Sequence, residues 1–538
     1  MLGNRLGTTE TDTQDVLEVA RNNTKGLQGL IDQHPGDIAA FISSPYDHPV
    51  YRDNTLPAPG YWQHVEALCK KNDIVLIVDD VRAGFRINLA GSNREYGFTP
   101  DLICFGKAIA NGHPLSALTG CDALRQTAQE VYFTGTQFFN AAPMAAAKAT
   151  FVVRSSESAD ATLVLATSTW NAYNTWGGAS YYTGGHVTSP MRPLQPGFLE
   201  KADPHLHRIA KYKDWTPEEM QAFRATGYDS WSMAAGSANW EMLFVRWAEQ
   251  QGYRLNYATS LDLDRDSRLL DKSRAYISIG HDEYWSADMR NTVENFVDAG
   301  GNAAFFSGNT AFWQVRFEAD YRQMVGYKCD IELDPMYEPT GAPELSTMWS
   351  DPLVGRPENE MTGVSFTRGG YAHMPNSPEG TGGYSVWQTD HWAFAKTQQK
   401  LGSTLGADGM VVGYECDGCE LTESNGRPIA SGSDSPLDFE VLGTATARLW
   451  ETEQAPATLA DNYIGELNWV AERLGGEDTL ENRERFSDGH AVMGIFRRSK
   501  GQVFTTGCTD WAYGLKDNDV AQVTSNVIDR FSQPPKKR

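Results

Sequence analysis

The sequence lacks an excess of positive charge. Its 538 residues include 46 Lys and Arg against 69 Asp and Glu, which gives a formal net charge of −23. Nucleic-acid backbones and anionic membrane surfaces attract proteins through basic surfaces, so this balance argues against both. We therefore expect no nucleic acid and no membrane among the binding partners.

Long hydrophobic runs are also missing. No uninterrupted apolar stretch reaches the length of about 20 residues that a membrane-spanning helix needs. The first residues, MLGNRLGTTETDTQDV, contain no apolar core of a secretory signal. The seven cysteines are odd in number and scattered, as is typical of reduced thiols, and the single Cys416–Cys419 pair is interpreted as ordinary thiols. The sequence therefore predicts a cytoplasmic protein.

What the chain does contain is the composition of a globular protein. Hydrophobic residues make up 41% and aromatic residues 11% of the sequence, which excludes a disordered chain. Its length predicts more than one domain. The polar stretch RSSESAD marks a boundary, so we predict a first domain over 1–150, a linker over 151–161 and a second domain over 162–538.

The most informative stretch lies between residues 274 and 316. Ala275–Ile279 and Ala303–Phe306 are short apolar runs, typical of buried parallel strands. Between them, apolar residues at helical spacing predict a helix that stops at Gly300. The pattern indicates a β-α-β unit.

Polar side chains follow both strands of this unit. His281, Asp282 and Glu283 come after the first strand, and Ser307 and Asn309 come after the second. Open α/β sheets bind ligands outside the carboxyl ends of their strands, and adjacent parallel strands end at the same edge. We therefore expect both clusters to face one substrate.

The surrounding sequence extends this architecture. Residues 160–315 alternate strands and helices, which predicts a mostly parallel sheet with helices on both faces. The strand TLVLATST leads into an aromatic, glycine-rich stretch over 170–182, which we predict to be a loop. Short segments over about 320–450 predict a β-rich insertion, and the C-terminal HAVMGIFRRSKGQVFTTG predicts a hairpin that returns to the sheet before a closing helix over 519–531.

The second part of the chain also carries a series of motifs, in the order LATSTWNAYNTWGGASYY, RWAEQQGYRLNYATSLDL, SIGHDEYW, FFSGNTAFWQVR, DHWAF, VVGYECDG and TTGCTDWAYGL. Over about residues 160–531 these motifs resemble the large, catalytic subunit of N,N-dimethylformamidase. The resemblance implies a glutamine-amidotransferase-like α/β core that holds a mononuclear Fe³⁺ ion. It also implies a small-molecule amide substrate, a homo-oligomer and a small accessory subunit.

The resemblance implies three iron ligands. Tyr173 would supply one phenolate and Tyr182 the other, with Tyr181 beside it as an alternative, and Glu283 would supply the carboxylate. The residues that match polar groups around the metal, and that would be catalytic, are His281, Asn309 and Glu415.

This set of side chains suits amide hydrolysis. Phenolate and carboxylate are hard ligands that favour trivalent iron, and a metal with open positions polarises a carbonyl and generates hydroxide. His281 would move protons, and Asn309 would donate to the developing oxyanion. Glu415 would protonate the departing amine or orient the water. The predicted function is hydrolysis of a small N-substituted amide to a carboxylic acid and an amine.

The first part of the chain carries the motifs IVDDVRAGFR, PDLICFGKAIANGHPLSAL and TGTQFFNAAPMAAAKAT. Over about residues 36–150 they resemble the class-III pyridoxal-phosphate aminotransferases. The resemblance implies that Lys107 forms the Schiff base, that Asp79 holds the pyridinium nitrogen and that Thr136 contacts the phosphate. The family's phosphate cradle and C-terminal domain have no counterpart, so we expect an incomplete aminotransferase-like α/β fragment.

Three alternatives remain open from the sequence. An aminotransferase or aminomutase that uses Lys107 and pyridoxal phosphate is one. A non-catalytic binding module on the amidotransferase-like sheet is another, with its tyrosines serving only in packing. A conventional zinc site would need the convergence of His186, His205 and His207.

Overall fold

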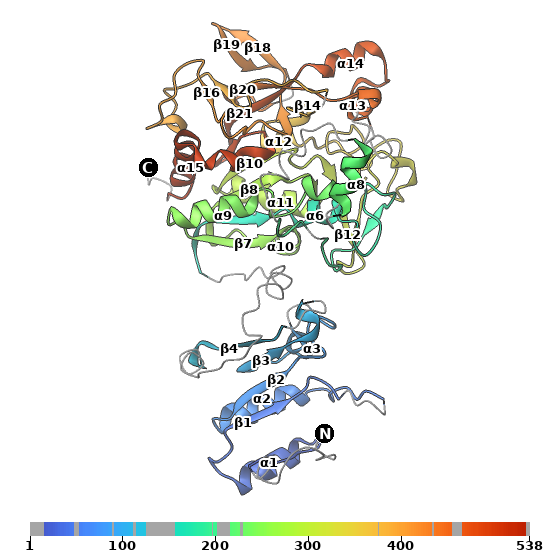
Figure 1. Cartoon of the computed structure of the whole chain (residues 1–538), viewed down its shortest axis with the longest axis vertical. Helices are drawn as coiled ribbons and strands as arrows, with labels where there is room; N and C mark the ends of the chain where they lie inside the picture. The colour runs from blue at the N-terminus through green and yellow to red at the C-terminus, as the bar shows by residue number, and fades with distance from the viewer. Residues whose placement is uncertain are drawn as a thin grey trace. The chain divides into compact units, whose positions relative to one another are not determined.

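The computed structural model describes residues 15–47, 53–88, 91–110, 115–124, 157–195, 197–201, 216–225, 230–374, 376–432, 435–454 and 465–533. The chain divides into two compact units, Met1–Thr150 and Phe151–Arg538 (Figure 1). Among the described residues, no helix has the length and apolar character to cross a membrane.

The first unit is built on a four-stranded sheet of order β1-β2-β3-β4. The first three strands pair in parallel and β4 is antiparallel to β3. Helices α1 and α2 pack around Trp62 and Val65. The elements are α1 Thr24–Gln33, β1 Ala40–Ser43, α2 Tyr61–Lys71, β2 Val75–Asp79, α3 Ser92–Tyr96, β3 Leu102–Phe105 and β4 Ala117–Gly120.

The second unit is organised around a nine-stranded sheet of order β16-β15-β20-β21-β22-β10-β8-β5-β7. Its strands are β5 Ala159–Leu165, β7 Leu255–Thr259, β8 Ser273–His281, β10 Asn302–Gly308, β15 Tyr384–Val386, β16 Thr404–Leu405, β20 Glu440–Ala447, β21 Gly489–Arg498 and β22 Gly501–Thr505. Its longer helices are α6 Thr167–Tyr173, α8 Pro217–Ala225, α9 Glu241–Gln250, α10 Ser260–Arg265, α11 Ala287–Asp298, α13 Glu466–Gly475, α14 Leu480–Ser487 and α15 Asn518–Phe531.

Smaller strands complete the unit outside this sheet. Strands β14 and β17 form an antiparallel pair, β12, β13 and β6 a three-stranded sheet, β9 and β11 a short parallel pair, and β18 and β19 a hairpin. The bounds are β6 Val187–Thr188, β9 Tyr284–Trp285, β11 Trp313–Gln314, β12 Arg316–Glu318, β13 Gln323–Val325, β14 Ser365–Tyr371, β17 Glu415–Gly418, β18 Leu421–Ser424 and β19 Arg427–Ala430, with the short helix α12 at Asn359–Thr362.

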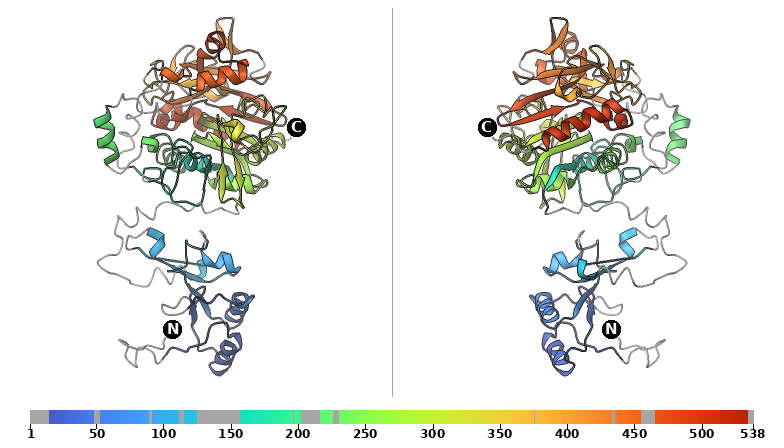
Figure 2. Two further views of the ribbon diagram at one scale, coloured as in Figure 1. Left: turned by 90° about the vertical axis from the view of Figure 1, so that its right-hand side faces the viewer. Right: turned by 90° about the vertical axis from the view of Figure 1, so that its left-hand side faces the viewer.

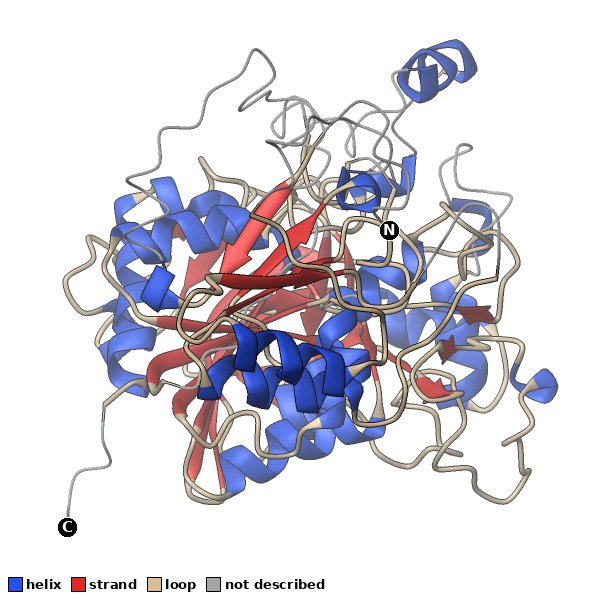
Figure 3. Cartoon of the chain, turned by 90° about the horizontal axis from the view of Figure 1, so that it is seen from below, coloured by secondary structure: helices blue, strands red, loops and turns tan. Residues whose placement is uncertain are grey.

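Both faces of the central sheet are apolar and covered by helices, as predicted. Successive side chains of a strand point to opposite faces, so an apolar run fills both. One set packs with α10 and α11, and the other packs with α9 and α15. Figures 2 and 3 show the helices lying on either side of the strands. The strand residues in the two sets are Val164, Tyr276 and Phe305 on the first face, and Leu163, Ile277 and Phe306 on the second.

The predicted β-α-β unit is confirmed. Strand β8, helix α11 and strand β10 follow one another, and β8 pairs in parallel with β10. Ser307 lies opposite Gly280 and Gly308 lies opposite His281. The polar residues that follow both strands therefore start from the same edge of the sheet.

The prediction of a mostly parallel sheet is confirmed for the strands of residues 160–315, but it does not hold for the half of the sheet that later segments add. Strands β7, β5, β8, β10 and β22 are parallel, but β21, β20, β15 and β16 continue the sheet in antiparallel pairing. The predicted C-terminal hairpin, β21–β22, makes the change of direction. The β-rich insertion adds β15, β16 and β20 to this edge, because antiparallel strands join a sheet without a crossover helix.

Two local predictions also need correction. The predicted linker ends early, because β5 already begins at Ala159. The predicted aromatic loop is preceded by helix α6, which contains Trp170 and ends at Tyr173. Every residue from Ser168 to Tyr173 is buried, so packing stabilises a helix that its Thr, Ser and Asn content does not favour.

The end of strand β8 requires a residue without a side chain at Gly280. Its φ is 79°, and a Cβ atom there would lie 2.5 Å from Cβ of Trp240. We expect Gly280→Ala to destabilise the protein by about 1 kcal/mol for the left-handed backbone and by about 1–3 kcal/mol more for overpacking. Thermal unfolding measures the loss.

Gly252→Ala is the matched control for this substitution. Gly252 has a similar φ of 85°, but nothing lies within 4 Å of a Cβ atom there. It should lose only the backbone contribution. Equal melting temperatures for the two variants would contradict a steric role for Trp240.

Candidate active site

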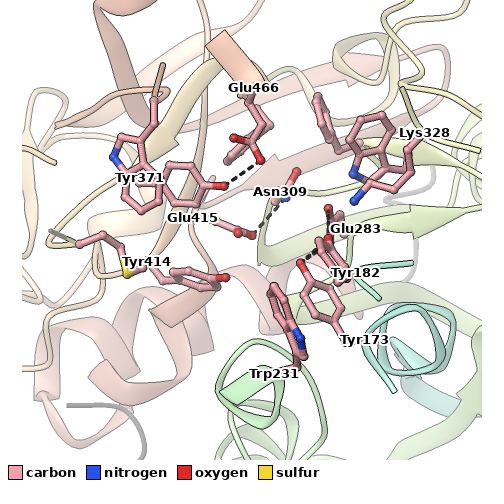
Figure 4. Close-up of a pocket in the computed structure, with 15 residues that line it drawn as sticks. Tyr173, Tyr182, Trp231, Glu283, Asn309, Lys328, Tyr371, Tyr414, Glu415 and Glu466 are labelled. Carbon is pink, nitrogen blue, oxygen red and sulfur yellow. Dashed lines mark hydrogen bonds between the residues drawn. The ribbon is translucent and has the colours of Figure 1, made fainter. Parts of the chain in front are cut away.

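The residues that follow β8 and β10 meet side chains from three other elements in one pocket. Tyr173 comes from the end of α6, Glu415 begins β17, and Tyr182 lies in the segment between α6 and β6. Figure 4 shows these side chains pointing toward one another. The cavity has a volume of about 50 Å³ and is lined by both tyrosines, Glu283, Asn309 and Glu415. Five of the six residues expected at the iron site thus line this cavity, and the sixth, His281, contacts two of them, Glu283 and Glu415.

Three oxygen-bearing side chains form the centre of this arrangement. The Tyr173 hydroxyl donates to Glu283 Oε2 at 2.9 Å, and the Tyr182 hydroxyl donates to the Tyr173 hydroxyl at 2.7 Å. Tyr182 Oη also lies 3.3 Å from Glu283 Oε1. The two tyrosine rings stack with centroids 4.2 Å apart, which fixes the direction of both hydroxyls.

Tyr181, the alternative to Tyr182, points elsewhere. Its hydroxyl donates to the backbone oxygen of Met324 at 2.8 Å. Its ring packs against Tyr284 with centroids 5.5 Å apart. In this structure Tyr182, and not Tyr181, directs its hydroxyl at Glu283.

The surroundings of this centre keep both phenols protonated when no cation is bound. Burial raises the pKa of both Tyr173 and Tyr182 well above its ordinary value, and the Glu283 carboxylate raises both further. The phenols alone therefore stay protonated, because two phenolates beside a carboxylate would repel one another in a site with little water. A positive charge among the three oxygens would reverse that balance.

The geometry also fits a small, hard metal ion. An octahedral ion with bonds of about 2.1 Å holds neighbouring ligand atoms about 3 Å apart. The oxygen atoms of Tyr173, Tyr182 and Glu283 are separated by 2.7 to 3.4 Å. Across the described part of the chain, no group of three or more His, Cys, Asp and Glu is arranged to hold a metal. A metal here would therefore depend on the tyrosines.

The same finding bears on the zinc alternative. His186 lies in the described part of the chain, where its Nε2 is 3.5 Å from Asp330 Oδ2 and its ring stacks on Tyr327. His205 and His207 lie outside the described residues. Within the described residues His186 belongs to no metal-binding group.

His281 is a buried imidazolium beside this centre. Its Nδ1 lies 2.7 Å from the backbone oxygen of Ala234, which can only accept, so Nδ1 carries a hydrogen. Its Nε2 lies 2.6 Å from Glu415 Oε2 and 3.2 Å from Glu283 Oε2. Burial alone would lower the pKa of His281, but these carboxylates outweigh it and raise the pKa well above its ordinary value.

Glu415 is the ionised partner of this histidine. Burial would raise the pKa of Glu415, but the His281 charge and hydrogen bond outweigh it and lower the pKa. Asn309 Nδ2 donates to Glu415 Oε2 at 3.1 Å. The Asn309 backbone is left-handed, with φ of 48°, and its Oδ1 is buried without a hydrogen-bond partner among the described residues. Asn309 Nδ2 also lies 3.5 Å from His281 Nε2, which carries a hydrogen and so cannot accept, and the second N–H bond of the amide therefore stays open to a ligand.

Sequence reasoning missed several residues of this pocket. Lys328 Nζ lies 3.8 Å from the ring centroid of Tyr182 and 5.0 Å from that of Trp313. Lys328 is buried, and burial lowers the pKa of its ammonium group. It lies in a connection after β13 that has no periodic pattern, so no sequence signal marked it. Other lining residues that were missed include Trp231, Tyr371, Tyr414 and Glu466, and Tyr284 reaches the site through a hydrogen bond between its hydroxyl and that of Tyr182.

The residues expected to bind pyridoxal phosphate lie in the first unit. Asp79 ends β2, and Lys107 follows β3 in a left-handed conformation with φ of 48°. Asp79 pairs with Cys104 of the adjacent parallel strand, so both residues belong to one sheet edge. Lys107 is exposed. Thr136 lies outside the described residues.

Comparison with known proteins decides the family. The sequence profile of the N,N-dimethylformamidase beta subunit-like, C-terminal family matches residues 127–524, which is most of the chain. The chain belongs to this family. The profile of the class-III aminotransferases matches residues 8–163, so the N-terminal part resembles a second enzyme family. Both resemblances predicted from the motifs are confirmed, and each match extends beyond the predicted N-terminal boundary.

Individual relatives match the aminotransferase-like part. Aminopentol aminotransferase of Sphingopyxis macrogoltabida is 38% identical over 141 residues, 26% of this chain and 33% of that protein. Glutamate-1-semialdehyde 2,1-aminomutase of Prosthecochloris aestuarii is 37% identical over 115 residues, 21% of this chain and 26% of that protein. The solved structure of Sphingopyxis sp. MTA144 FumI protein has 38% identity and a TM-score of 0.26, and the match covers 26% of this chain and 34% of that one. The chain thus spans about a third or less of these relatives.

The burial of Lys328 predicts that its replacement by an apolar residue changes the free energy of unfolding. Among the described residues, no carboxylate lies within salt-bridge distance of the buried Lys328 ammonium group, which makes its burial costly. Contact with the rings of Tyr182 and Trp313 offsets only part of that cost. We expect Lys328→Met to raise the free energy of unfolding by about 1 kcal/mol or more. Chemical denaturation measures the change.

The exposed Lys400 provides the control. Lys400→Met should leave stability nearly unchanged, because its ammonium group is already in water. A less stable Lys328→Met variant would show that the ammonium group is compensated in the folded protein, contrary to the argument from burial.

Proposed function

We propose that this chain hydrolyses a small N-substituted amide, of formamide type, in an iron-dependent reaction that gives a carboxylic acid and an amine. Family membership supports the reaction class. The observation that carries the proposal is the convergence of the Tyr173 and Tyr182 hydroxyls on Glu283 at 2.7 to 3.4 Å. A non-catalytic binding module would have no need for a buried imidazolium beside them.

Tyr173, Tyr182 and Glu283 would hold the Fe³⁺ ion as two phenolates and a carboxylate, a hard donor set that suits this ion. When bound, the ion would polarise an amide carbonyl and lower the pKa of a water molecule. The parallel strands β7, β5, β8, β10 and β22 support a glutamine-amidotransferase-like core as part of this proposal. A homo-oligomer, a small accessory subunit and a cytoplasmic location also belong to it.

The protein's own side chains would handle the protons. His281 carries a hydrogen on Nε2, held between Glu283 and Glu415, and would transfer it to the departing nitrogen. Glu415 is ionised and so would orient His281 and the water, while the proton for the amine comes from the histidine. Asn309 would use its second N–H bond to stabilise the oxyanion, an effect typically worth about 3 kcal/mol.

The cavity size supports a small substrate. One water molecule needs about 10–15 Å³ of such a cavity, so a volume of about 50 Å³ corresponds to about three to five water-sized groups. An amide with only a few non-hydrogen atoms matches this space. Aromatic side chains line much of the wall and would exclude bulk water from the carbonyl.

Iron content of the purified protein is the decisive measurement. We expect near-stoichiometric iron, with a visible tyrosinate charge-transfer band, after expression in iron-replete medium. Tyr182→Phe and Glu283→Ala should each lose most of the iron, because each removes one of three ligands. Amide hydrolysis should fall by at least about a hundredfold in both, by the precedent of metal-site variants.

Tyr181→Phe is the matched control, because Tyr181 is adjacent in sequence but directs its hydroxyl at the backbone of Met324. It should retain both the iron and the charge-transfer band. A protein that contains no iron, or that loses it equally in all three variants, would overturn the proposed site.

A second candidate function rests on the first unit. The 38% identity to aminopentol aminotransferase supports a pyridoxal-phosphate site that uses Lys107 and Asp79. The two residues lie at one sheet edge, which fits a cofactor attached to the lysine with its ring nitrogen held by the carboxylate. The cofactor would supply an electron sink for amino-group transfer.

Absorbance tests this second candidate. If the first unit binds pyridoxal phosphate, the protein should show a near-ultraviolet to violet band that borohydride bleaches. Lys107→Ala should abolish the band, and Lys25→Ala, in the same unit, should not. Absence of the band after incubation with the cofactor would leave amide hydrolysis as the single function.

A further inference from the structure

One end of the pocket is built from aromatic side chains around a carboxylate. The Tyr371 hydroxyl donates to Glu466 Oε1 at 3.1 Å, and the Tyr371 ring stacks on Trp450 with centroids 3.9 Å apart. The rings of Phe366 and Tyr414 lie 5.6 and 6.3 Å from that of Tyr371. Figure 4 shows Glu466 and Tyr371 at the side of the pocket away from Trp231.

The carboxylate is held at this place by its own helix. Glu466 is the first residue of α13, and the N-terminus of a helix favours a negative charge. The backbone N–H of Leu467 donates to the Trp450 backbone oxygen at 3.1 Å, which ties the start of α13 to the stacked ring. The Trp450 indole N–H donates to Ser377 Oγ at 2.8 Å, so the ring orientation is also fixed. Both ends of the corner, the Trp450 ring and the start of α13, are thus held by the protein's own hydrogen bonds.

This aromatic corner lies beside the groups that handle protons. Tyr371 is the direct cross-strand partner of Glu415 in the antiparallel pair β14–β17. Directly opposed residues of such a pair project from the same face, with Cβ atoms about 5 Å apart. Glu415 in turn contacts His281, whose Nε2 proton goes to the leaving nitrogen in the proposed reaction. In that reaction the nitrogen side of the amide would lie toward Tyr371 and Glu466.

The charge of the product matches this corner. A neutral amide and one water molecule give a carboxylate and an alkylammonium ion at neutral pH. The C–N bond breaks, one water oxygen bonds to the acyl carbon, and the nitrogen gains two protons. An ammonium ion is attracted both to a carboxylate and to the faces of tyrosine and tryptophan rings.

We propose that Tyr371, Trp450 and Glu466 form a subsite for the amine half of the substrate, which holds the N-alkyl groups and then the alkylammonium product. The role of this subsite rests on the proposed amide hydrolysis. Binding of an alkylammonium ion to the subsite, however, requires neither the metal nor catalytic turnover. A purely apolar pocket for neutral N-alkyl groups would have no use for a carboxylate at this end.

Ligand-observed NMR on the full-length protein tests the subsite. The protein is titrated in separate experiments with dimethylammonium chloride and with 2-propanol, a neutral molecule of similar size. The broadening of the ligand's methyl signals reports binding. We expect the cation to bind at least about tenfold more tightly than the alcohol, because only the cation gains from the carboxylate and the ring faces.

Three variants identify the groups responsible. Glu466→Gln should weaken dimethylammonium binding by about tenfold, since it removes the charge but keeps the shape. Tyr371→Phe keeps the ring face and loses the hydrogen bond to Glu466, so its affinity for dimethylammonium should fall by about two- to threefold. Glu472→Gln changes an exposed carboxylate of the same helix and should bind as the parent protein does. Thermal melting of each variant checks that it is folded.

Two outcomes would overturn the subsite: equal binding of the cation by Glu466→Gln and the parent protein, or equal binding of the cation and the alcohol. The proposed function can fail separately. If the protein contains no iron but still binds dimethylammonium through Glu466, the subsite is supported and the proposed hydrolase function is contradicted. If the protein hydrolyses amides but binds the product amine independently of Glu466, the function is supported and the subsite is contradicted.

Discussion

The parallel pairing of β8 with β10 is the constraint on which the pocket depends. The register places Gly308 opposite His281, so the two chains leave the sheet side by side and their polar residues start from adjacent points. His281 then contacts Glu283 and Glu415, and Asn309 donates to Glu415, which reaches the same place from an antiparallel pair outside the main sheet. A shift of one residue would turn every side chain of the strand to the other face and separate these groups.

The pocket gathers buried charged groups beside an apolar core. Glu283, Glu415, His281 and Lys328 are all buried within it, next to two phenols whose pKa values burial raises. Such a set is stable only because rigid elements hold it. Helices on both faces of the sheet supply that rigidity, with Phe244 and Trp511 on one side and Met289 and Val293 on the other. The apolar core thus keeps these charged groups close enough to act together.

The sequence predicted the elements with strong local patterns. Strand β8, helix α11 and strand β10 followed from their apolar spacing, and the polar residues after each strand pointed to the site. Helix α6 was missed because its residues, among them Thr167 and Asn171, have low helix propensity, and packing stabilises it. Lys328, Tyr371 and Glu466 were missed because they reach the pocket from distant segments, and no local pattern encodes such meetings.

The order of strands in the central sheet has a consequence for biosynthesis. Strand β22, Gly501–Thr505, lies between β10 and β21, although it is translated almost 200 residues after β10. During translation, the edge of β10 that later pairs with β22 therefore remains unpaired while the insertion and its strands emerge from the ribosome. An exposed edge strand is a template for intermolecular association. The nascent chain thus passes through an aggregation-prone stage that ends only when its last hairpin inserts.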